Sequence, residues 1–241
     1  FLGVIPEQDK ENENLTSEAF KIVRTNMSFL SRKDRKIQVI MCTSFSSGDG
    51  KTFVSLNLAN SFISARKKVV LVDLDIRKGT LTAHFSKHSH HHAQGVTNYL
   101  ADTDLRLDDI ISSDTGVEGL DLIPSGSIAP NPAELLMDER LDEMFKELRN
   151  RYDVIITDSV PVGLVADATI ANRVADLTLF VVRAGRLDRR QLPDIEAMYQ
   201  ERKLTNMSLL LNGADFHHHG YGYGYGYGYG HGYGYGYGYG Y

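Results

Sequence analysis

The chain has 241 residues, of which 42% are hydrophobic and 24% charged, and its formal net charge is −5. This length allows one domain with a substantial buried core, and the acidic balance gives no support for general nucleic-acid binding. The single cysteine, Cys42, lies in the apolar run IQVIMC, which predicts a buried thiol in a reducing compartment rather than a nucleophile. The sequence has no signal peptide and no apolar run of about 18 residues. Because it starts at Phe1, we expect a fragment of a longer protein, which leaves a membrane segment upstream open.

The first predicted element is a helix over residues 15–36. Thr16 or Ser17 can cap its start, and Glu18 is an acidic residue suited to its first turn. Apolar side chains recur at helical spacing and predict one buried face. These side chains are Phe20, Val23, Met27 and Leu30.

Apolar runs that alternate with helical patterns follow along the rest of the chain. The runs predict buried parallel strands at 37–44, 68–75, 120–125, 152–159, 176–183 and 207–212. The helical patterns lie at 52–65, 132–150, 166–173 and 189–203. This alternation predicts an α/β fold with a doubly wound, mostly parallel sheet of the P-loop NTPase type. Ligands of such sheets bind at the carboxyl ends of the strands.

A phosphate-binding loop is predicted directly after the first of these strands. The segment SFSSGDGKTFVS joins a strand to a helix, which is the context that a P-loop requires, although Phe45 replaces the usual first glycine. Gly48 and Gly50 allow backbone N–H groups to face phosphate oxygens, and the helix N-terminus adds its dipole. Lys51 is expected to reach the β- and γ-phosphates, and Thr52 to ligate Mg²⁺. The predicted ATP-binding residues of this segment are Ser47, Gly48, Asp49, Gly50, Lys51, Thr52 and Phe53.

Two further predicted strands end in carboxylates. LVDLD places Asp73 and Asp75 two residues apart, so both are expected to point to the same side of the strand. VIITD delivers Asp158 as a Walker B aspartate that can hold a Mg²⁺ water. Taken singly, a chance glycine-rich turn or a solvated strand end would explain each segment. Together they predict one Mg²⁺–ATP site, with Lys51, Asp73, Asp75 and Asp158 as catalytic residues and Thr52, Asp73 and Asp158 as metal-binding residues.

Several segments together resemble the bacterial tyrosine kinases, or BY-kinases, over nearly the whole chain, about residues 1–241. They are SSGDGKT, VVLVDLDIRKGTL, IPSGSIAPNPAELL, YDVIITDSVP and the terminal tyrosine cluster. Members of this family are cytoplasmic kinase domains of polysaccharide co-polymerases, which control capsule or exopolysaccharide export. The resemblance implies a Walker A motif at 45–52, a Walker A′ motif ending at Asp73 and Asp75, and a Walker B motif at Asp158.

The resemblance also implies a setting and partners. It places the chain at the cytoplasmic face of the bacterial inner membrane, in cis with a co-polymerase domain or beside a separate membrane activator, and opposed by a phosphotyrosine phosphatase. It implies a homo-oligomeric ring, an octamer, whose subunits phosphorylate each other's tyrosine tails. The family's Glu-x-x-Arg-x-x-Arg contact motif corresponds to Glu18, Lys21 and Arg24. Lysine lacks the planar fork of arginine, which affects the ring contacts rather than the fold. A solvated helix face is the alternative.

Residues 216–241 form a glycine–tyrosine tail after the predicted kinase domain at 1–215, of which 1–36 is the segment for subunit contacts. The tail lacks aliphatic side chains for a core, so we expect it to be disordered or weakly held. Its reach and its glycines suit entry into a neighbouring subunit's site, whereas the alternative is an adhesive tail that promotes assembly. The predicted phosphoacceptors are Tyr221, Tyr223, Tyr225, Tyr227, Tyr229, Tyr233, Tyr235, Tyr237, Tyr239 and Tyr241.

The predicted reaction is phosphoryl transfer to a phenol, which relies mainly on positioning and charge neutralisation. Asp75, in preference to Asp73, is expected to accept or orient the tyrosine proton. Each phosphotyrosine adds ~1.5–2 negative charges, which predicts that modified tails repel one another and disperse the ring.

Three further features have open interpretations. Arginines after the strand at 176–183 contact the nucleotide, a subunit or only solvent; they are Arg183, Arg186, Arg189 and Arg190. The histidines have three possible roles: they bind a metal, form a polar loop, or border the site and contact tails. They are His84, His88, His90, His91, His92, His217, His218 and His219. Asn212, near the end of the last predicted strand, is a candidate for contact with the nucleotide base.

Two rival functions fit part of the pattern. A partitioning or cell-division-positioning ATPase shares the sheet, the P-loop and the aspartates, but Ser46 stands in place of its signature lysine and it has no tyrosine tail. A non-enzymatic scaffold would not need Lys51, Thr52 and three aspartates. The kinase hypothesis therefore accounts for more of the sequence than either rival.

Overall fold

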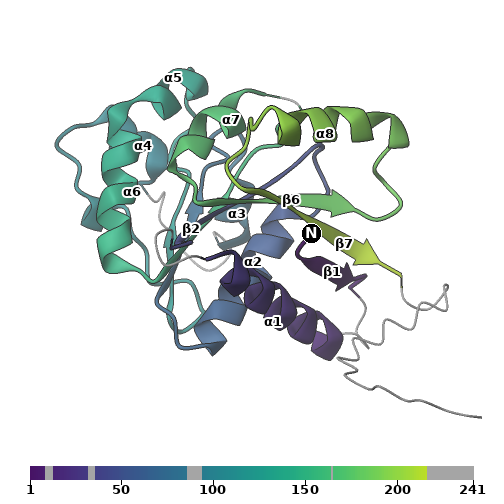
Figure 1. Cartoon of the computed structure of the whole chain (residues 1–241). Coiled ribbons are helices and arrows are strands. Elements are labelled where there is room, and N and C mark those ends of the chain that lie inside the picture. Colours follow the sequence, from purple (N-terminus) through teal and green to yellow (C-terminus); the bar gives the residue numbers. More distant parts are fainter. Residues whose placement is uncertain (9–12, 32–35, 86–93, 164, 216–241) are drawn as a thin grey trace, which may run out of the picture.

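The computed structural model describes residues 1–8, 13–31, 36–85, 94–163 and 165–215. In this part of the chain, seven parallel strands form one sheet in the order β1-β7-β6-β2-β5-β3-β4 (Figure 1). The strands are β1 (Gly3–Pro6), β2 (Val39–Ser44), β3 (Val69–Asp73), β4 (Leu120–Ile123), β5 (Val154–Asp158), β6 (Leu177–Arg183) and β7 (Met207–Ala214). The predicted α/β fold with a doubly wound parallel sheet is confirmed.

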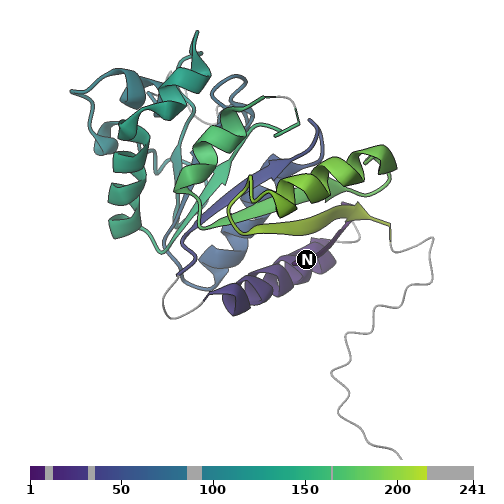
Figure 2. The ribbon, with the colours of Figure 1, turned by 45° about the horizontal axis from the view of Figure 1, so that its top comes forward.

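Helices cover both faces of the sheet, as Figures 1 and 2 show. One face carries α1 (Glu13–Leu30), α2 (Lys51–Ser64) and α3 (Thr80–Phe85). The other face carries α4 (Val96–Ala101), α5 (Pro132–Met137), α6 (Glu139–Arg151), α7 (Asp167–Ala171) and α8 (Leu192–Gln200). Short 3₁₀ turns lie at Leu107–Asp109, Asn172–Val174 and Arg189–Gln191. Among the described residues, no helix is both long and apolar enough to cross a membrane.

The core lies in two layers because successive strand side chains point to opposite faces. In β2, Ile40 and Cys42 belong to the cluster under α1 and α2, whereas Val39 and Met41 belong to the cluster under α6. Both faces of the central strands are therefore buried, which explains their continuous apolar runs. Burial raises the pKa of Cys42 to about 12, so the predicted inert core thiol is confirmed.

The N-terminal segment differs from the prediction in three ways. Strand β1 was not predicted, and it pairs with β7 at one edge of the sheet. Helix α1 starts at Glu13, so Thr16 lies buried inside the helix instead of capping it. Phe20, Val23 and Met27 form the buried face as predicted, but Leu30 at the helix end is 44% exposed.

The predicted helix at 132–150 is two helices. Asp138 has an extended backbone (φ −62°, ψ 142°), and its side chain accepts a 2.8 Å hydrogen bond from the Arg140 N–H. An aspartate that caps a new helix ends the previous one, which separates α5 from α6. Helices α3 and α4 were not predicted; each has six residues, too short for a clear helical period.

The strand order brings the predicted motifs together. Strand β5 lies between β2 and β3, with Asp158 in register with Cys42 and with Asp73. Because all three strands are parallel, their carboxyl ends meet at one edge of the sheet.

Candidate active site

The loop between β2 and α2 has the backbone of a phosphate cradle. Gly48 and Gly50 have φ values of +85° and +95°, which other residues rarely adopt. A Cβ atom on Gly50 would lie 2.2 Å from Asn212 Nδ2, and one on Gly48 would lie 2.8 Å from Arg186 Nη1. Backbone conformation therefore requires both glycines, and the buried Asn212 side chain leaves no space for a Cβ atom at Gly50.

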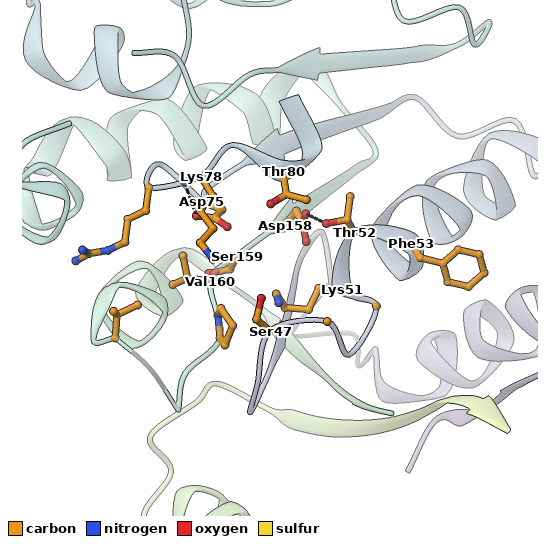
Figure 3. Close-up of a pocket in the computed structure, with 15 residues that line it drawn as sticks. Ser47, Lys51, Thr52, Phe53, Asp75, Lys78, Thr80, Asp158, Ser159 and Val160 are labelled. Carbon is orange, nitrogen blue, oxygen red and sulfur yellow. Dashed lines mark hydrogen bonds between the residues drawn. The ribbon is translucent and has the colours of Figure 1, made fainter. Parts of the chain in front are cut away.

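A cavity of about 270 Å³ opens in front of this loop (Figure 3). Ser47 and Lys51 lie on one side, Asp75 and Lys78 lie on the other, and Thr52 and Asp158 lie between them. The Lys51 Nζ donates a 3.3 Å hydrogen bond to Ser44 Oγ, and burial lowers the Lys51 pKa. The cavity therefore combines cations on both sides with carboxylates, an arrangement suited to a polyphosphate and a divalent cation.

Asp158 is buried at the end of β5. Its Oδ2 accepts a 2.5 Å hydrogen bond from the Thr52 hydroxyl, and its Oδ1 accepts one of 3.4 Å from Ser55. Burial raises the Asp158 pKa to about 7, and the neighbouring carboxylates add to this rise, while the Thr52 hydrogen bond opposes it. The ionised form of this carboxylate is therefore unfavourable unless a cation approaches it.

Asp73 and Asp75 have different surroundings. Strand β3 ends at Asp73, so Asp75 lies in the following loop, and strand alternation does not fix its position. Asp73 is buried and accepts hydrogen bonds from the Thr82 N–H (2.8 Å), the Thr82 hydroxyl (2.6 Å) and the Asp75 N–H (3.1 Å). Burial raises its pKa to about 6. Asp75 instead lines the cavity and accepts a 3.0 Å hydrogen bond from the Lys78 N–H.

The other predicted ATP-binding residues divide into two groups. Ser47, Gly48, Gly50, Lys51, Thr52 and Phe53 line the cavity. Asp49 and Asn212 lie behind the loop: Asp49 Oδ2 accepts a 3.1 Å hydrogen bond from the Ser46 N–H, and the Asn212 amide donates a 2.9 Å hydrogen bond to the Asp49 carbonyl. In this structure Asn212 therefore contacts the P-loop from β7 rather than facing the cavity.

Several lining residues had no role assigned from the sequence. Arg77, Lys78 and Thr80 line the cavity directly after the Walker A′ aspartates. Arg77 donates two hydrogen bonds, of 2.6 and 3.0 Å, to the buried Asp167. The position of these residues beside a predicted motif was an available signal, whereas nothing local marked Asp167, which lies 90 residues away.

The four flagged arginines do not act as a group. Arg186 donates a 3.0 Å hydrogen bond to the Gly48 carbonyl of the P-loop. Arg183 pairs with Glu7 at 3.2 Å and Arg190 pairs with Asp188 at 2.5 Å, while Arg189 is exposed in a 3₁₀ turn. Only Arg186 thus contacts the phosphate cradle.

The three residues predicted to make subunit contacts have different surroundings in the structure. Glu18 and Lys21 form an exposed 2.6 Å ion pair on α1. Arg24 donates to the Ser61 carbonyl of α2, so part of its bonding capacity is used within the chain. Glu18 and Lys21 are the members of the triplet that face solvent.

Other predicted residues fall outside the described chain. These are the tyrosines of 216–241 and the histidines of 88–92 and 217–219. His84 is exposed, with its ring edge-on to Phe85. Within the described ranges, no cluster of three or more His, Cys, Asp or Glu forms a metal site.

Comparisons with known proteins add a family context. The family described as "AAA domain" matches residues 37–206. The tyrosine-protein kinase YwqD of Bacillus subtilis is 35% identical over 210 residues, which cover 87% of this chain and 86% of YwqD. A putative tyrosine-protein kinase in the cps region of Klebsiella pneumoniae is 34% identical over 83% of this chain, which spans 27% of that protein. The kinase domain of the Escherichia coli tyrosine kinase ETK superposes with a TM-score of 0.78 at 25% identity, covering 98% of this chain and 94% of that domain.

Proposed function

The chain belongs to the bacterial tyrosine-kinase family of these relatives, and we propose that it phosphorylates the tyrosine tail of a second copy of itself. It is a protein-tyrosine kinase with a P-loop nucleotide site. The observation that carries the assignment is the meeting of Lys51, Thr52, Asp75 and Asp158 in one cavity. Phosphoryl transfer needs this set because charge neutralisation and positioning supply most of its catalysis.

The residues of the cavity fit Mg²⁺–ATP. The positive-φ glycines and the N-terminus of α2 would hold the phosphates, with Lys51 beside the β- and γ-groups. Thr52 and Asp158, already joined by a hydrogen bond, would hold the Mg²⁺ ion directly and through water. When bound, this ion neutralises the charge that develops on the transferred phosphoryl group.

Asp75 is the group best placed to receive the tyrosine proton. It lines the cavity and has one hydrogen bond from the Lys78 N–H. Asp73 is occupied by three hydrogen bonds, two of them from Thr82, and supports the position of α3 and of the Asp75 loop. We therefore assign proton acceptance to Asp75 and positioning of the loop to Asp73.

The acceptors are the ten tyrosines of residues 216–241, carried beyond a kinase domain at 1–215. Strand β7 ends at Ala214, and all strands of the described sheet are parallel, so the last described residue before the tail, Asp215, follows the edge of the sheet where the cavity opens. An extended chain spans about 3.3 Å per residue, so this tail can reach a neighbouring molecule. Glycine on both sides of each tyrosine lets the backbone enter the cavity without side-chain clashes.

The assembly we propose is a ring of copies of this chain, with Glu18 and Lys21 on the exposed side of α1 among its contacts. By family resemblance, the ring acts at the cytoplasmic face of the bacterial inner membrane with a co-polymerase domain or activator, controls capsule or exopolysaccharide synthesis and export, and is reset by a phosphotyrosine phosphatase. The cps-region name of one relative agrees with this role.

The direct test is intact-mass analysis after incubation with Mg²⁺–ATP. We expect the full chain to gain phosphate on tyrosine, and neither Lys51→Met nor a chain ending at Asp215 to do so. ATP hydrolysis without any phosphotyrosine would instead support the positioning-type ATPase and leave the tail as an assembly device.

A further inference from the structure

A second cavity of about 200 Å³ lies next to the nucleotide cavity. Arg77 and Lys78 line both cavities, so the two are adjacent. The far wall of the second cavity is made by Ser125, Gly126 and Ile128, from the loop that follows β4.

This loop is held in one conformation by hydrogen bonds. The Ser125 N–H donates to Thr82 Oγ1 at 2.8 Å, and the Thr97 N–H donates to the Ser125 carbonyl at 3.0 Å. Thr97 Oγ1 also donates to the Ser127 carbonyl at 2.7 Å. Because Thr82 also donates to Asp73, the loop is connected to the Walker A′ strand. The cavity wall is thus pre-organised rather than formed on binding.

Ile128 is presented to solvent by this rigid loop. Its side chain is 83% exposed, the highest value among the large hydrophobic side chains that the structure describes. Isolated exposed apolar residues are common, but this one borders a cavity that adjoins the catalytic site. It is therefore placed to contact a molecule that enters that site.

The direction of the reaction places the acceptor on this side. The P-loop holds the phosphates from the side of Ser47 and Lys51, and the attacking oxygen must approach in line from the opposite side. Figure 3 shows Asp75, Lys78 and Thr80 on that opposite side. The second cavity shares Arg77 and Lys78 with the nucleotide cavity, so it lies beside the side of the site from which a tyrosine would approach Asp75.

We propose that Ile128 and the 125–128 loop bind the glycine–tyrosine tail of a second copy of the chain, next to the tyrosine that reacts. In an extended chain, tyrosines two residues apart lie on the same side, about 6.6–6.8 Å from each other. One ring in the nucleotide cavity thus brings the next ring toward Ile128, and the intervening glycine adds no side chain. Lys78, which has no ion pair within the described residues, can approach that ring from its face.

This docking rests on the proposed transfer between copies, and the test separates the two. A donor chain that ends at Asp215 is mixed with an acceptor that carries Lys51→Met and the intact tail, and initial rates are measured against acceptor concentration. Ile128→Ser in the donor is expected to raise the KM for the acceptor about tenfold, with kcat and the affinity for a fluorescent ATP analogue within twofold of the unchanged donor. Leu192→Ser, which removes a half-exposed leucine on α8, is the matched control and should change neither constant.

A second comparison places the same substitution in the acceptor instead of the donor. Ile128→Ser in the acceptor should have no effect, because that copy contributes only its tail. Two results would overturn the docking while transfer between copies stands. One is an unchanged KM when Ile128→Ser is in the donor. The other is an equal change in KM whether Ile128→Ser is in the donor or in the acceptor. If the unchanged donor, the chain ending at Asp215, transfers no phosphate to the acceptor, both the transfer between copies and the docking are overturned.

Discussion

The Thr52 hydroxyl donates a 2.5 Å hydrogen bond to Asp158 Oδ2, which joins the first turn of α2 to the end of β5. The two residues are 106 positions apart in the chain. Their contact fixes the P-loop helix against the strand that carries the buried carboxylate. In the proposed function these two side chains would hold Mg²⁺, so the fold brings the residues of the proposed metal site together before any ligand arrives.

Asp158 makes the stability of the ligand-free protein depend on pH. Burial raises its pKa to about 7 from the usual 3.8, so between about pH 4 and pH 7 the folded protein keeps a proton that the unfolded chain has released. Stability attributable to this group therefore falls as the pH rises through that window. Asp158→Asn should unfold in urea at the same concentration as the wild type below about pH 4 and be more stable than the wild type above pH 7, by on the order of a few kcal/mol.

The same variant should lose the response to metal. Mg²⁺–ADP is expected to raise the unfolding temperature of the wild type more at pH 8 than at pH 6, because the carboxylate must be ionised to hold the cation. Asp158→Asn should show no such Mg²⁺ effect. A variant with the wild-type pH dependence would contradict the account of this buried carboxylate.

Asp75 and Asp73 should separate into a chemical and a structural role. Asp75→Asn is expected to bind ATP with near-normal affinity while kcat falls about 100-fold or more, because the proton acceptor is lost. Asp73→Asn should lower the free energy of unfolding by about 1–3 kcal/mol through its three hydrogen bonds. Full-rate phosphorylation by an Asp75→Asn protein that binds ATP would refute the assignment.

Asn212 should act on the nucleotide through the P-loop. Asn212→Ala removes the hydrogen bond to the Asp49 carbonyl behind Gly50, and we expect a loss of about 1–2 kcal/mol in stability and weaker ATP binding. Asn206→Ala is the control, because its amide also donates to a carbonyl, that of Asp176, but away from the cavity. Calorimetric titration should show weaker ATP binding only for Asn212→Ala; equal affinities would contradict this role.

Phosphorylation of the tail should disperse the proposed ring. Each phosphotyrosine adds ~1.5–2 negative charges, so ten would add roughly 15–20 to one short segment. Light scattering should show a smaller oligomer mass after incubation with Mg²⁺–ATP at low salt. High salt should restore part of that mass, because it screens the repulsion between tails. The chain ending at Asp215 should keep its mass. An oligomer of unchanged mass after complete phosphorylation would count against the switch.

Local sequence was sufficient for the long buried strands and the P-loop, because apolar runs, glycines and a following helix each leave a pattern within a few residues. Local sequence was insufficient for features that depend on residues far away in the chain. Strand β1 has four residues, one of them Pro6, and is recognisable only by its pairing with β7 about 200 residues later. The position of Asp75 depends on where β3 ends, and the alternation of apolar and acidic residues from Val72 to Asp75 hides that end.

The same limit applies to the site. The P-loop and the Asp158 position follow from motifs, but Asn212 contacts the loop from another strand, and Arg77 depends on Asp167 from α7. The 125–128 loop that carries Ile128 is held by contacts with α3 and α4. None of these contacts has a signature in a single stretch of sequence.

The measurement that tests the central claim most directly is phosphate transfer between two incomplete copies. Lys51→Met supplies a tail without activity, and the chain ending at Asp215 supplies activity without a tail; each is incubated alone and then mixed with Mg²⁺–ATP. We predict that intact mass finds phosphotyrosine on the Lys51→Met tail only in the mixture. An unmodified tail in the mixture, while the full wild-type chain still phosphorylates itself, would contradict transfer between copies.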